Sequence, residues 1–559
     1  MSEPTLSTQE PDSEPAKHVP PTGKFIPKPG VFVPSAALLI LFVVITAIFP
    51  TKMGEWIGKA NSTVVGDLGW WYIALVTGFV AFSIWAAIGR TGDVVLGKEG
   101  DEPEFRLGSW FAMLFAAGMG IGLVFWGVAE PLNHFNSPPP GTNPDTAAGH
   151  ARTAMDITFL HWGLSAWAIY VVVGLGVAYA VHRRGLPVSI RWALEPVLGK
   201  YAHGFIGDVV DVIAVLGTVF GVATSLGLGV SQLGAGLDFL GWVNDPSKWV
   251  LILLVIVITA CALVSVVTGV DKGIKWLSNI NMVLAVVLVV FVLIAGPTVF
   301  ILTDFFTQIG SYLRNFLSLT FDGRPYEGEA GQAWLSGWTT YYWGWWMSWA
   351  PFVGVFIARI SKGRTVREFV AGVLLVPTLV TFLWFSVMGG TAIYREMYQG
   401  GGIIGEDGVD TNTALFQMLD GLPWPAITSV VAMILLVIFF VTSSDSASFV
   451  VDMLSSGGNP NPPKWSRAMW ASMEGAIAAV LLFVGLTLQE TDPDANPLGA
   501  LQTMAILLAL PFSIVMVMMV VSITKSLLAE ARSAEVESRK WLAERVAKHI
   551  NDNDMVDKS

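Results

Sequence analysis

Charged residues are scarce in this sequence of 559 residues. Only 13% of them are Asp, Glu, Lys or Arg, whereas 53% are apolar and the mean hydropathy is +0.61. Because soluble domains carry about 25% charged residues, this scarcity excludes a string of soluble domains and indicates a polytopic membrane protein. The net charge of −11 also argues against nucleic acid as a partner.

Cysteine and targeting signals are nearly absent as well. The one cysteine, Cys261, lies in an apolar run and can form no internal disulfide, so we interpret it as a small helix residue. Residues 1–30 are polar and proline-rich, without a basic segment leading into a cleavable apolar stretch. We therefore expect a disordered cytoplasmic N-terminal tail rather than a signal peptide.

Long apolar runs, by contrast, are abundant. A spanning helix needs about 20 mostly apolar residues. Twelve runs meet this measure, at approximately 31–50, 70–89, 108–130, 153–181, 208–237, 249–270, 278–302, 334–359, 366–393, 424–444, 468–487 and 498–524. The sequence thus predicts an all-α fold with twelve transmembrane helices.

Lys and Arg are distributed unequally between the connections. If both termini are placed in the cytoplasm, 25 of the 32 basic residues fall in the tails and the even-numbered connections. Cytoplasmic segments of membrane proteins are enriched in Lys and Arg. The distribution supports the helix count and predicts a multi-pass protein of the cell membrane with cytoplasmic termini.

Two of the apolar runs contain residues that an unbroken helix avoids. The third, FAAGMGIGLVFWGVAEP, carries Gly118, Gly120 and Gly122, and the eighth, WGWWMSWAPF, carries Gly344 and Pro351. Each glycine inside a helix costs about 1 kcal/mol relative to alanine, and proline costs more. We predict interruptions in both helices, with the freed backbone groups facing a protein-lined cavity. A close helix–helix contact is the alternative interpretation of GMGIG.

The spacing of the two interrupted runs predicts an internal repeat. In transporters with inverted repeats, substrate and coupling ions bind where such breaks meet. The predicted parts are a tail at 1–30, two accessory helices at 31–89, a first five-helix repeat at 108–302, an extracellular connection with a short helix at 303–333, a second repeat at 334–524, and a cytoplasmic C-terminal helix and tail at 525–559.

Aromatic residues are concentrated in two of the predicted helices. In YYWGWWMSWAPF, the rings spaced to share one helical face are Tyr342, Trp345, Trp346 and Trp349. In HWGLSAWAIY, a second face carries Trp162, Trp167 and Tyr170. An interfacial aromatic belt or ordinary packing is the alternative interpretation.

Rings gathered inside a membrane protein suit a particular ligand. A box of Trp and Tyr faces attracts a cation that cannot donate hydrogen bonds, by up to about 2 kcal/mol per desolvated ring. We place no Asp or Glu in mid-membrane near either interruption, so the rings are expected to act without a fixed charge. The backbone amides of residues 118–122 are expected to bind an anionic group. These features indicate a zwitterion with a methylated ammonium and a carboxylate.

His161 stands alone beside Trp162, and we interpret it as structural.

These motifs resemble the betaine/choline/carnitine transporter family, and most closely its sodium-coupled glycine betaine permeases. The resemblance runs from about Glu104 to Thr524 and rests on GMGIGLVFWGVAEP, HWGLSAWAIY, GTVFGVATSLGLG, YYWGWWMSWAPFVGVFIARISKGR and FFVTSSDSAS. It implies the inverted-repeat fold of amino-acid and sodium symporters, usually as a homotrimer in the lipid membrane. It also implies transport rather than enzymatic catalysis.

The resemblance implies roles for individual residues. Substrate would bind to the aromatic and glycine positions Trp162, Trp167, Tyr170, Trp346, Trp345, Trp349, Gly118, Gly120 and Gly122. A sodium ion, as the coupling ion, would bind to the backbone carbonyls of Ala116 and Met119 and to Phe439, Thr442 and Ser443.

A second sodium site is implied with an incomplete ligand set. Thr218 and Phe352 match it, but the remaining position is Val222, which offers no oxygen. A second ion therefore requires Thr224 or Ser225 as a replacement ligand.

The coupling ion and the solute stay open between two predictions. Members that resemble proton-coupled choline carriers have Asp in place of the last glycine of GMGIG, whereas this sequence has Gly122. We expect sodium symport of glycine betaine or a related compatible solute. The alternative is a proton-coupled or exchange carrier for choline, carnitine, ectoine or dimethylsulfoniopropionate.

Overall fold

The computed structural model describes residues 27–118, 120–142, 144–268, 271–492 and 495–556. Most of the expected N-terminal tail, residues 1–26, lies outside the described residues. The first half of the chain forms α1 (Pro29–Ile48), α2 (Pro50–Ala87), η1 (Gly89–Asp93), α3 (Leu107–Gly118), α4 (Ile121–Asn136), α5 (Ala147–Trp162), α6 (Leu164–Ala178), η2 (Tyr179–Arg183), α7 (Ile190–Ala193), α8 (Glu195–Leu198), η3 (Gly199–His203), α9 (Phe205–Phe239) and α10 (Lys248–Thr268).

The second half is also helical apart from one small hairpin. Its elements are α11 (Asp271–Ala295), α12 (Thr298–Thr320), α13 (Gly328–Gly337), α14 (Thr339–Ile360), α15 (Val366–Tyr398), β1 (Ile404–Gly405), β2 (Gly408–Val409), α16 (Ala414–Asp420), α17 (Pro425–Ser455), α18 (Lys464–Thr491) and α19 (Gly499–Val556). The strands β1 and β2 pair antiparallel. The all-α prediction is confirmed.

Among the described residues, ten helices are long and apolar enough to cross a membrane, or eleven if the bent pair α3 and α4 forms one span. The remaining predicted run corresponds to α14, whose 22 residues have the length of a span. Its Thr, Tyr, Ser and Gly residues make it less apolar than the others.

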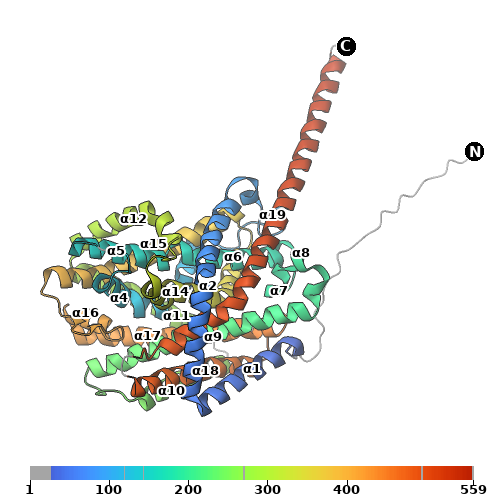
Figure 1. The fold of residues 1–559 in the computed structure, drawn as a ribbon. Coiled ribbons are helices and arrows are strands. Elements are labelled where there is room, and N and C mark those ends of the chain that lie inside the picture. The colour runs from blue at the N-terminus through green and yellow to red at the C-terminus, as the bar shows by residue number, and fades with distance from the viewer. Residues whose placement is uncertain (1–26, 119, 143, 269–270, 493–494, 557–559) are drawn as a thin grey trace, which may run out of the picture.

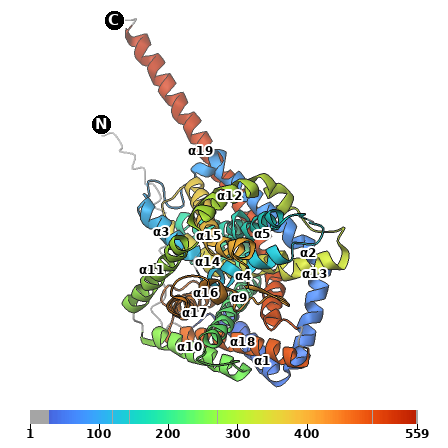
Figure 2. The ribbon, with the colours of Figure 1, turned by 90° about the vertical axis from the view of Figure 1, so that its left-hand side faces the viewer.

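The helix α14 lies at the centre of the body in both ribbon views (Figures 1 and 2) and packs against α6, α9 and α19. Around it, α15 packs against α3, α4 and α6, and α17 packs against α9, α10, α11 and α18. Nearly every side chain of α14 is buried. The aromatic stretch of the sequence therefore occupies the core.

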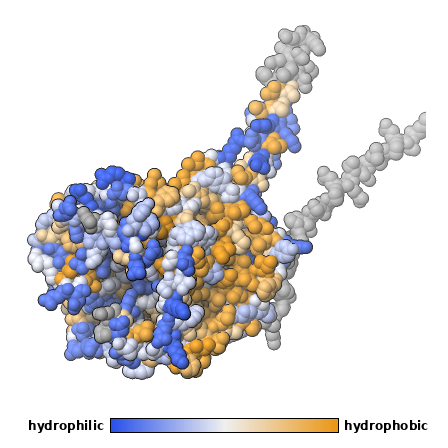
Figure 3. Space-filling model, in the orientation of Figure 1, coloured by the Kyte–Doolittle hydropathy of each residue, from blue (hydrophilic) through white to orange (hydrophobic). Residues whose placement is uncertain are grey.

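The outer surface of the body has a broad apolar area on one side, and hydrophilic residues gather on the left-hand side of the same view (Figure 3). Side chains such as Leu253 and Ile256 of α10, and Val283 and Val286 of α11, are about half exposed. Apolar side chains in such numbers are stable against lipid rather than water.

Several helices begin or end away from the approximate bounds of the predicted apolar spans. The second helix begins at Pro50 rather than near residue 70, because its first turns are amphipathic and too polar for a hydropathy count. The seventh run ends at Ala295, and a separate 23-residue helix, α12, fills much of the predicted extracellular connection. Gly296 and Pro297 separate the two helices, as proline favours a helix start over a helix interior.

The C-terminal helix is longer than predicted and continuous with the last span. The helix α19 runs unbroken from Gly499 to Val556 and projects from the body (Figure 1). The helix expected over 525–559 therefore continues the last span.

The predicted interruption of the third helix is confirmed. The chain leaves the helical conformation between Gly118 and Ile121, and the two halves are bent by 67°. Gly120 at this point has an extended backbone, with φ −169° and ψ −176°.

The predicted interruption of the eighth helix at Gly344 and Pro351 is wrong, because α14 is continuous through both residues. A Cβ atom on Gly344 would lie 2.7 Å from the Cα of Ile506, so this glycine permits close packing against α19 instead of unwinding the helix. The break lies earlier, at Trp338 between α13 and α14. As a result, a short helix followed by a longer one begins each predicted repeat.

The fourth predicted helix has a break at Gly163 that the sequence did not predict. It ends at Trp162 and resumes at Leu164, with Gly163 between α5 and α6. A Cβ atom on Gly163 would lie 2.4 Å from the carbonyl oxygen of Phe159 and 2.8 Å from the ring of Phe382. Only glycine fits this turn.

Candidate functional site

One cavity at the centre of the body brings together the aromatic residues that the sequence singles out. It is lined by Trp162, Trp167, Tyr170, Trp345, Trp346 and Trp349. Gly120 and Gly122 from the interruption between α3 and α4 also line it. Gly118 is the last residue of α3.

The rings of the cavity wall form one stacked pair, with other rings set edge-on to it. Trp345 and Trp346 are stacked, with centroids 4.6 Å apart and planes 15° apart. Trp162 stands edge-on to Trp346 at 4.8 Å and 71°, and Tyr170 lies 6.4 Å from Trp346 at 68°. Faces set in this way form a concave apolar wall, which is the arrangement that attracts a quaternary ammonium group.

Hydrogen bonds fix the orientation of the indole rings. The Nε1 of Trp346 donates to the carbonyl oxygen of His161 at 2.9 Å, and the Nε1 of Trp345 donates to that of Gly221 at 3.2 Å. The rings are therefore positioned before any ligand binds, which reduces the entropy cost of binding.

The N-terminus of α4 opens onto the same cavity. Gly120 is its N-cap, and no side chain caps the first turn. The first backbone N–H groups of a helix have no partner within the helix and carry a partial positive charge. An anionic group in the cavity can accept hydrogen bonds from them.

Gly122 lies directly under the rings. A Cβ atom at this position would be 2.7 Å from Cη2 of Trp345 and 3.1 Å from Cη2 of Trp162. A Cβ atom on Gly120 would instead lie 3.9 Å from Trp349. The cavity in this shape therefore leaves no room for an aspartate at position 122.

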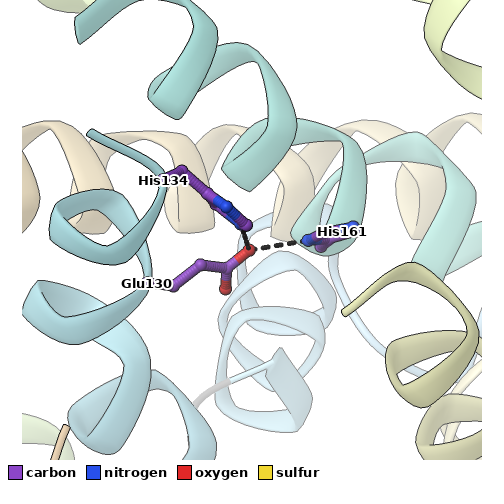
Figure 4. Close-up of side chains that lie close together, drawn as sticks. All are labelled: Glu130, His134 and His161. Atoms are coloured by element: carbon purple, nitrogen blue, oxygen red, sulfur yellow. Dashed lines mark hydrogen bonds and ion pairs between the residues drawn. The ribbon is translucent and has the colours of Figure 1, made fainter. Parts of the chain in front are cut away.

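The expectation that no carboxylate lies near the interruption is wrong. Glu130 of α4 is fully buried, and its side chain points toward α5 (Figure 4). Its Oε2 accepts hydrogen bonds from Nε1 of Trp162, at 2.6 Å, and from the hydroxyl of Tyr342. Its Oε1 lies 2.7 Å from Nδ1 of His161 and 3.6 Å from Nε2 of His134.

The interpretation of His161 as an isolated residue is wrong for the same reason. Its ring joins Glu130 to the hydroxyl of Thr339 at the start of α14, with Nε2 3.0 Å from that oxygen. The signal for this cluster was present in the segment WGVAEPLNH, since an ionisable residue within a membrane helix usually marks a functional site. The predicted third span, 108–130, ends at Glu130, so the span did not place this residue in mid-membrane.

A second cavity contains most of the predicted sodium ligands. Ala116 of α3 and Phe439, Thr442 and Ser443 of α17 line it. Trp349 lines both cavities. The hydroxyl of Thr442 donates to the carbonyl oxygen of Ile438 at 2.8 Å, which leaves its lone pairs available to a hard cation. Met119 lies outside the described residues.

The residues of the implied second sodium site have different surroundings. Phe352 lines the cavity that also holds Thr442, whereas the hydroxyl of Thr218 donates to the carbonyl oxygen of Ala214 in its own helix. The hydroxyl of Thr224 donates within α9 to Phe220, and Ser225 lines the aromatic cavity.

Comparison with known proteins decides the family. The profile of the BCCT, betaine/carnitine/choline family transporter, matches residues 30–532. The chain belongs to this family. It is therefore a multi-pass membrane transporter rather than an enzyme.

Relatives that are named as transporters agree with this assignment. An uncharacterized transporter of Mycobacterium bovis is 50% identical over 493 residues, which cover 88% of this chain and 81% of the relative. A glycine betaine transporter of Bacillus subtilis is 44% identical and covers 85% and 89%. A probable glycine betaine transporter of Desulfitobacterium hafniense is 42% identical and covers 88% and 96%.

Proposed function

We propose that this BCCT protein imports glycine betaine or a closely related compatible solute by sodium symport with alternating access. The observation that carries the proposal is one cavity lined both by an aromatic wall and by the uncapped N-terminus of α4. The wall suits a trimethylammonium group and the helix terminus suits a carboxylate. A betaine joins these two groups through one methylene, and relatives at 42–44% identity carry glycine betaine in their names.

Sodium coupling is supported by the second cavity. Its lining includes the hydroxyls of Thr442 and Ser443 on α17, beside those of Ser278 and Ser446. Ala116, near the end of α3, also lines it. Hydroxyl and carbonyl oxygens are ligands for a hard monovalent cation. An ion there would contact both α17 and α3. Because α3 and α4 form one interrupted helix and α4 lines the substrate cavity, the ion and the substrate would bind to the same interrupted helix.

Two further features of the proposal concern the termini and the outer surface. The distribution of Lys and Arg supports cytoplasmic termini. The exposed apolar faces of α10 and α11 fit either lipid or neighbouring copies in a homotrimer.

Uptake of labelled glycine betaine tests the proposal in a strain without other betaine transporters. We expect saturable uptake that falls at least tenfold when sodium is replaced by potassium at constant ionic strength. Equal uptake in the two salts, at several pH values, would contradict sodium coupling. A chain with both Thr442→Ala and Ser443→Ala should lose sodium dependence, whereas Ser472→Ala, a hydroxyl bonded within α18, should behave as the wild type.

A proton-coupled or exchange carrier for choline, carnitine, ectoine or dimethylsulfoniopropionate is the second candidate. A relative in Vibrio parahaemolyticus, 41% identical over 511 residues, is named a glycine betaine/proline/choline transporter. Competition of each unlabelled solute against labelled betaine separates these candidates. The proposal predicts that betaine competes at the lowest concentration.

A further inference from the structure

The buried carboxylate of Glu130 lies directly behind the aromatic cavity. Trp162 has its ring in the cavity wall and its Nε1–H bonded to Oε2 of Glu130 at 2.6 Å. The hydroxyl of Tyr342, whose ring lies 5.5 Å from Trp162 and 5.8 Å from Trp346, donates to the same oxygen. Glu130 therefore reaches the cavity through the rings rather than by lining it.

We propose that Glu130 is an ionised positioning residue, whose negative charge behind Trp162 strengthens the attraction of the aromatic wall for the cationic end of the substrate. The inference rests on the proposed function. A carboxylate that accepts the indole N–H pushes electron density toward the ring, and the face of that ring is what attracts a cation. The charge also acts on the ammonium directly, because a dry interior screens it little.

The hydrogen bonds of the cluster fit the ionised form. Trp162 can only donate through Nε1, and a carboxylate can only accept. If the hydroxyl of Thr339 donates to Nε2 of His161, then Nδ1–H of that ring donates to Oε1 of Glu130. The polar hydrogens of Trp162, Tyr342, Thr339 and His161 then all have acceptors. The ring nitrogens of His134 have no hydrogen-bond partner among the described residues. If Glu130 instead carried the proton and donated it to Nδ1, the hydroxyl hydrogen of Thr339 would have no acceptor among the described residues.

The surrounding charges leave the carboxylate without a fixed cationic partner in the described part of the chain. The neighbouring titratable groups are His161 and His134, at 2.7 and 3.6 Å from Oε1. Arg324 lies over the ring of Trp334, beyond the two histidines, and is itself paired with Asp322 at 2.7 Å.

A metal ion is the competing explanation. The ligand atoms of Glu130, His134 and His161 lie within 4.8 Å of one another (Figure 4), and these residue types bind zinc. However, Oε2 of Glu130 already accepts hydrogen bonds from Tyr342 and from Trp162, which lines the cavity. Its Oε1 lies 2.7 Å from Nδ1 of His161. A metal would have to displace the bond to His161, so the geometry favours the positioning role.

The test compares two ligands of the same shape. Glycine betaine and 3,3-dimethylbutanoate differ only in a quaternary nitrogen replaced by carbon, so the ratio of their affinities isolates the positive charge. In purified full-length protein with sodium, Glu130→Gln keeps the size and one acceptor oxygen but removes the charge. We expect betaine to bind about tenfold more weakly, equivalent to about 1.4 kcal/mol, whereas 3,3-dimethylbutanoate, an anion without a cationic end, should lose no affinity.

Two variants serve as controls. Asp156→Asn removes another buried carboxylate, on the same helix as Trp162, that is held by Ser311 and Asn315 at 2.9 and 2.8 Å. It should leave the affinity ratio unchanged. Glu130→Asp keeps the charge and should retain most of the ratio. If Glu130→Gln does not accumulate, Glu130→Met takes its place with the same prediction.

Two results would overturn the inference. Equal losses for both ligands in Glu130→Gln would assign Glu130 to the structure alone. Loss of betaine affinity on EDTA treatment, restored by zinc and absent from His134→Ala, would assign the cluster to a metal. If the wild type binds choline but not betaine, the proposed function fails, and choline with 3,3-dimethylbutan-1-ol tests Glu130 in the same way.

Discussion

Two buried carboxylates of this transporter are held in opposite ways. Asp211 of α9 accepts hydrogen bonds from Ser189 and from the backbone and guanidinium of Arg191. Arg191 also pairs with Asp208, which pairs with Lys28. Each negative charge in this region therefore lies against a permanent positive charge. The paired charges cancel, so they exert little electrostatic attraction on groups farther away.

Glu130 is equally buried but accepts its hydrogen bonds from an indole, a phenol and an imidazole. Donors of this kind stabilise a carboxylate without cancelling its charge. Burial alone therefore does not distinguish a structural carboxylate from a functional one. Two further features do: whether the hydrogen-bond partners neutralise its charge, and whether those partners line a binding cavity.

The largest effect is expected from breaking the ion pair of Asp211. Arg191→Met leaves a buried carboxylate without its cation, and removal of one partner of such a pair costs about 3–5 kcal/mol of the free energy of unfolding. We expect a large drop in the thermal midpoint of the purified protein and little folded material.

The double variant Arg191→Met with Asp211→Leu is the control for this prediction, since it removes both charges together. It should regain most of the lost stability. A single variant as stable as the wild type would show that the pair does not neutralise Asp211.

The next effect concerns the rings in front of Glu130. Trp346→Leu removes one face of the aromatic wall, worth about 2 kcal/mol, and should raise the KM for betaine roughly 30-fold. The thermal midpoint should change much less than in Arg191→Met. Trp249→Leu, an exposed indole of α10, is the matched control. An unchanged KM in Trp346→Leu would refute the assignment of the wall.

A smaller effect is expected from Gly122→Ala. The added methyl group would meet the rings of Trp345 and Trp162, and overpacking of this kind costs at least about 1 kcal/mol. We expect a roughly fivefold higher KM for betaine. Gly78→Ala, where a Cβ atom meets nothing within 4 Å, should leave transport unchanged. Equal behaviour of the two variants would contradict the close approach of Gly122.

The sequence predicted those parts of the fold that depend on composition and local spacing. Apolar runs located the spans, and the alternating glycines located the bend between α3 and α4. The periodicity of the rings in α14 placed Trp345, Trp346 and Trp349 on the cavity. In each case the residues themselves determine burial or backbone freedom.

The features that the sequence did not predict depend on partners from distant segments. Gly344 does not break α14, because Ile506 of α19 packs against it. Gly163 breaks the fourth helix, where the ring of Phe382 leaves no room for a side chain. The role of Glu130 depends on donors 32 and 212 positions away. Spacing along the chain carries no signal for contacts of this kind.

The attraction of the aromatic wall for positive charge is the central claim, and one measurement tests it most directly. It is the ratio of the affinities of the wild-type protein for glycine betaine and for 3,3-dimethylbutanoate, in sodium, at one pH. The account predicts that betaine binds at least tenfold more tightly, because the rings attract its ammonium group. Equal affinities would contradict it, since the rings would then act only as an apolar wall.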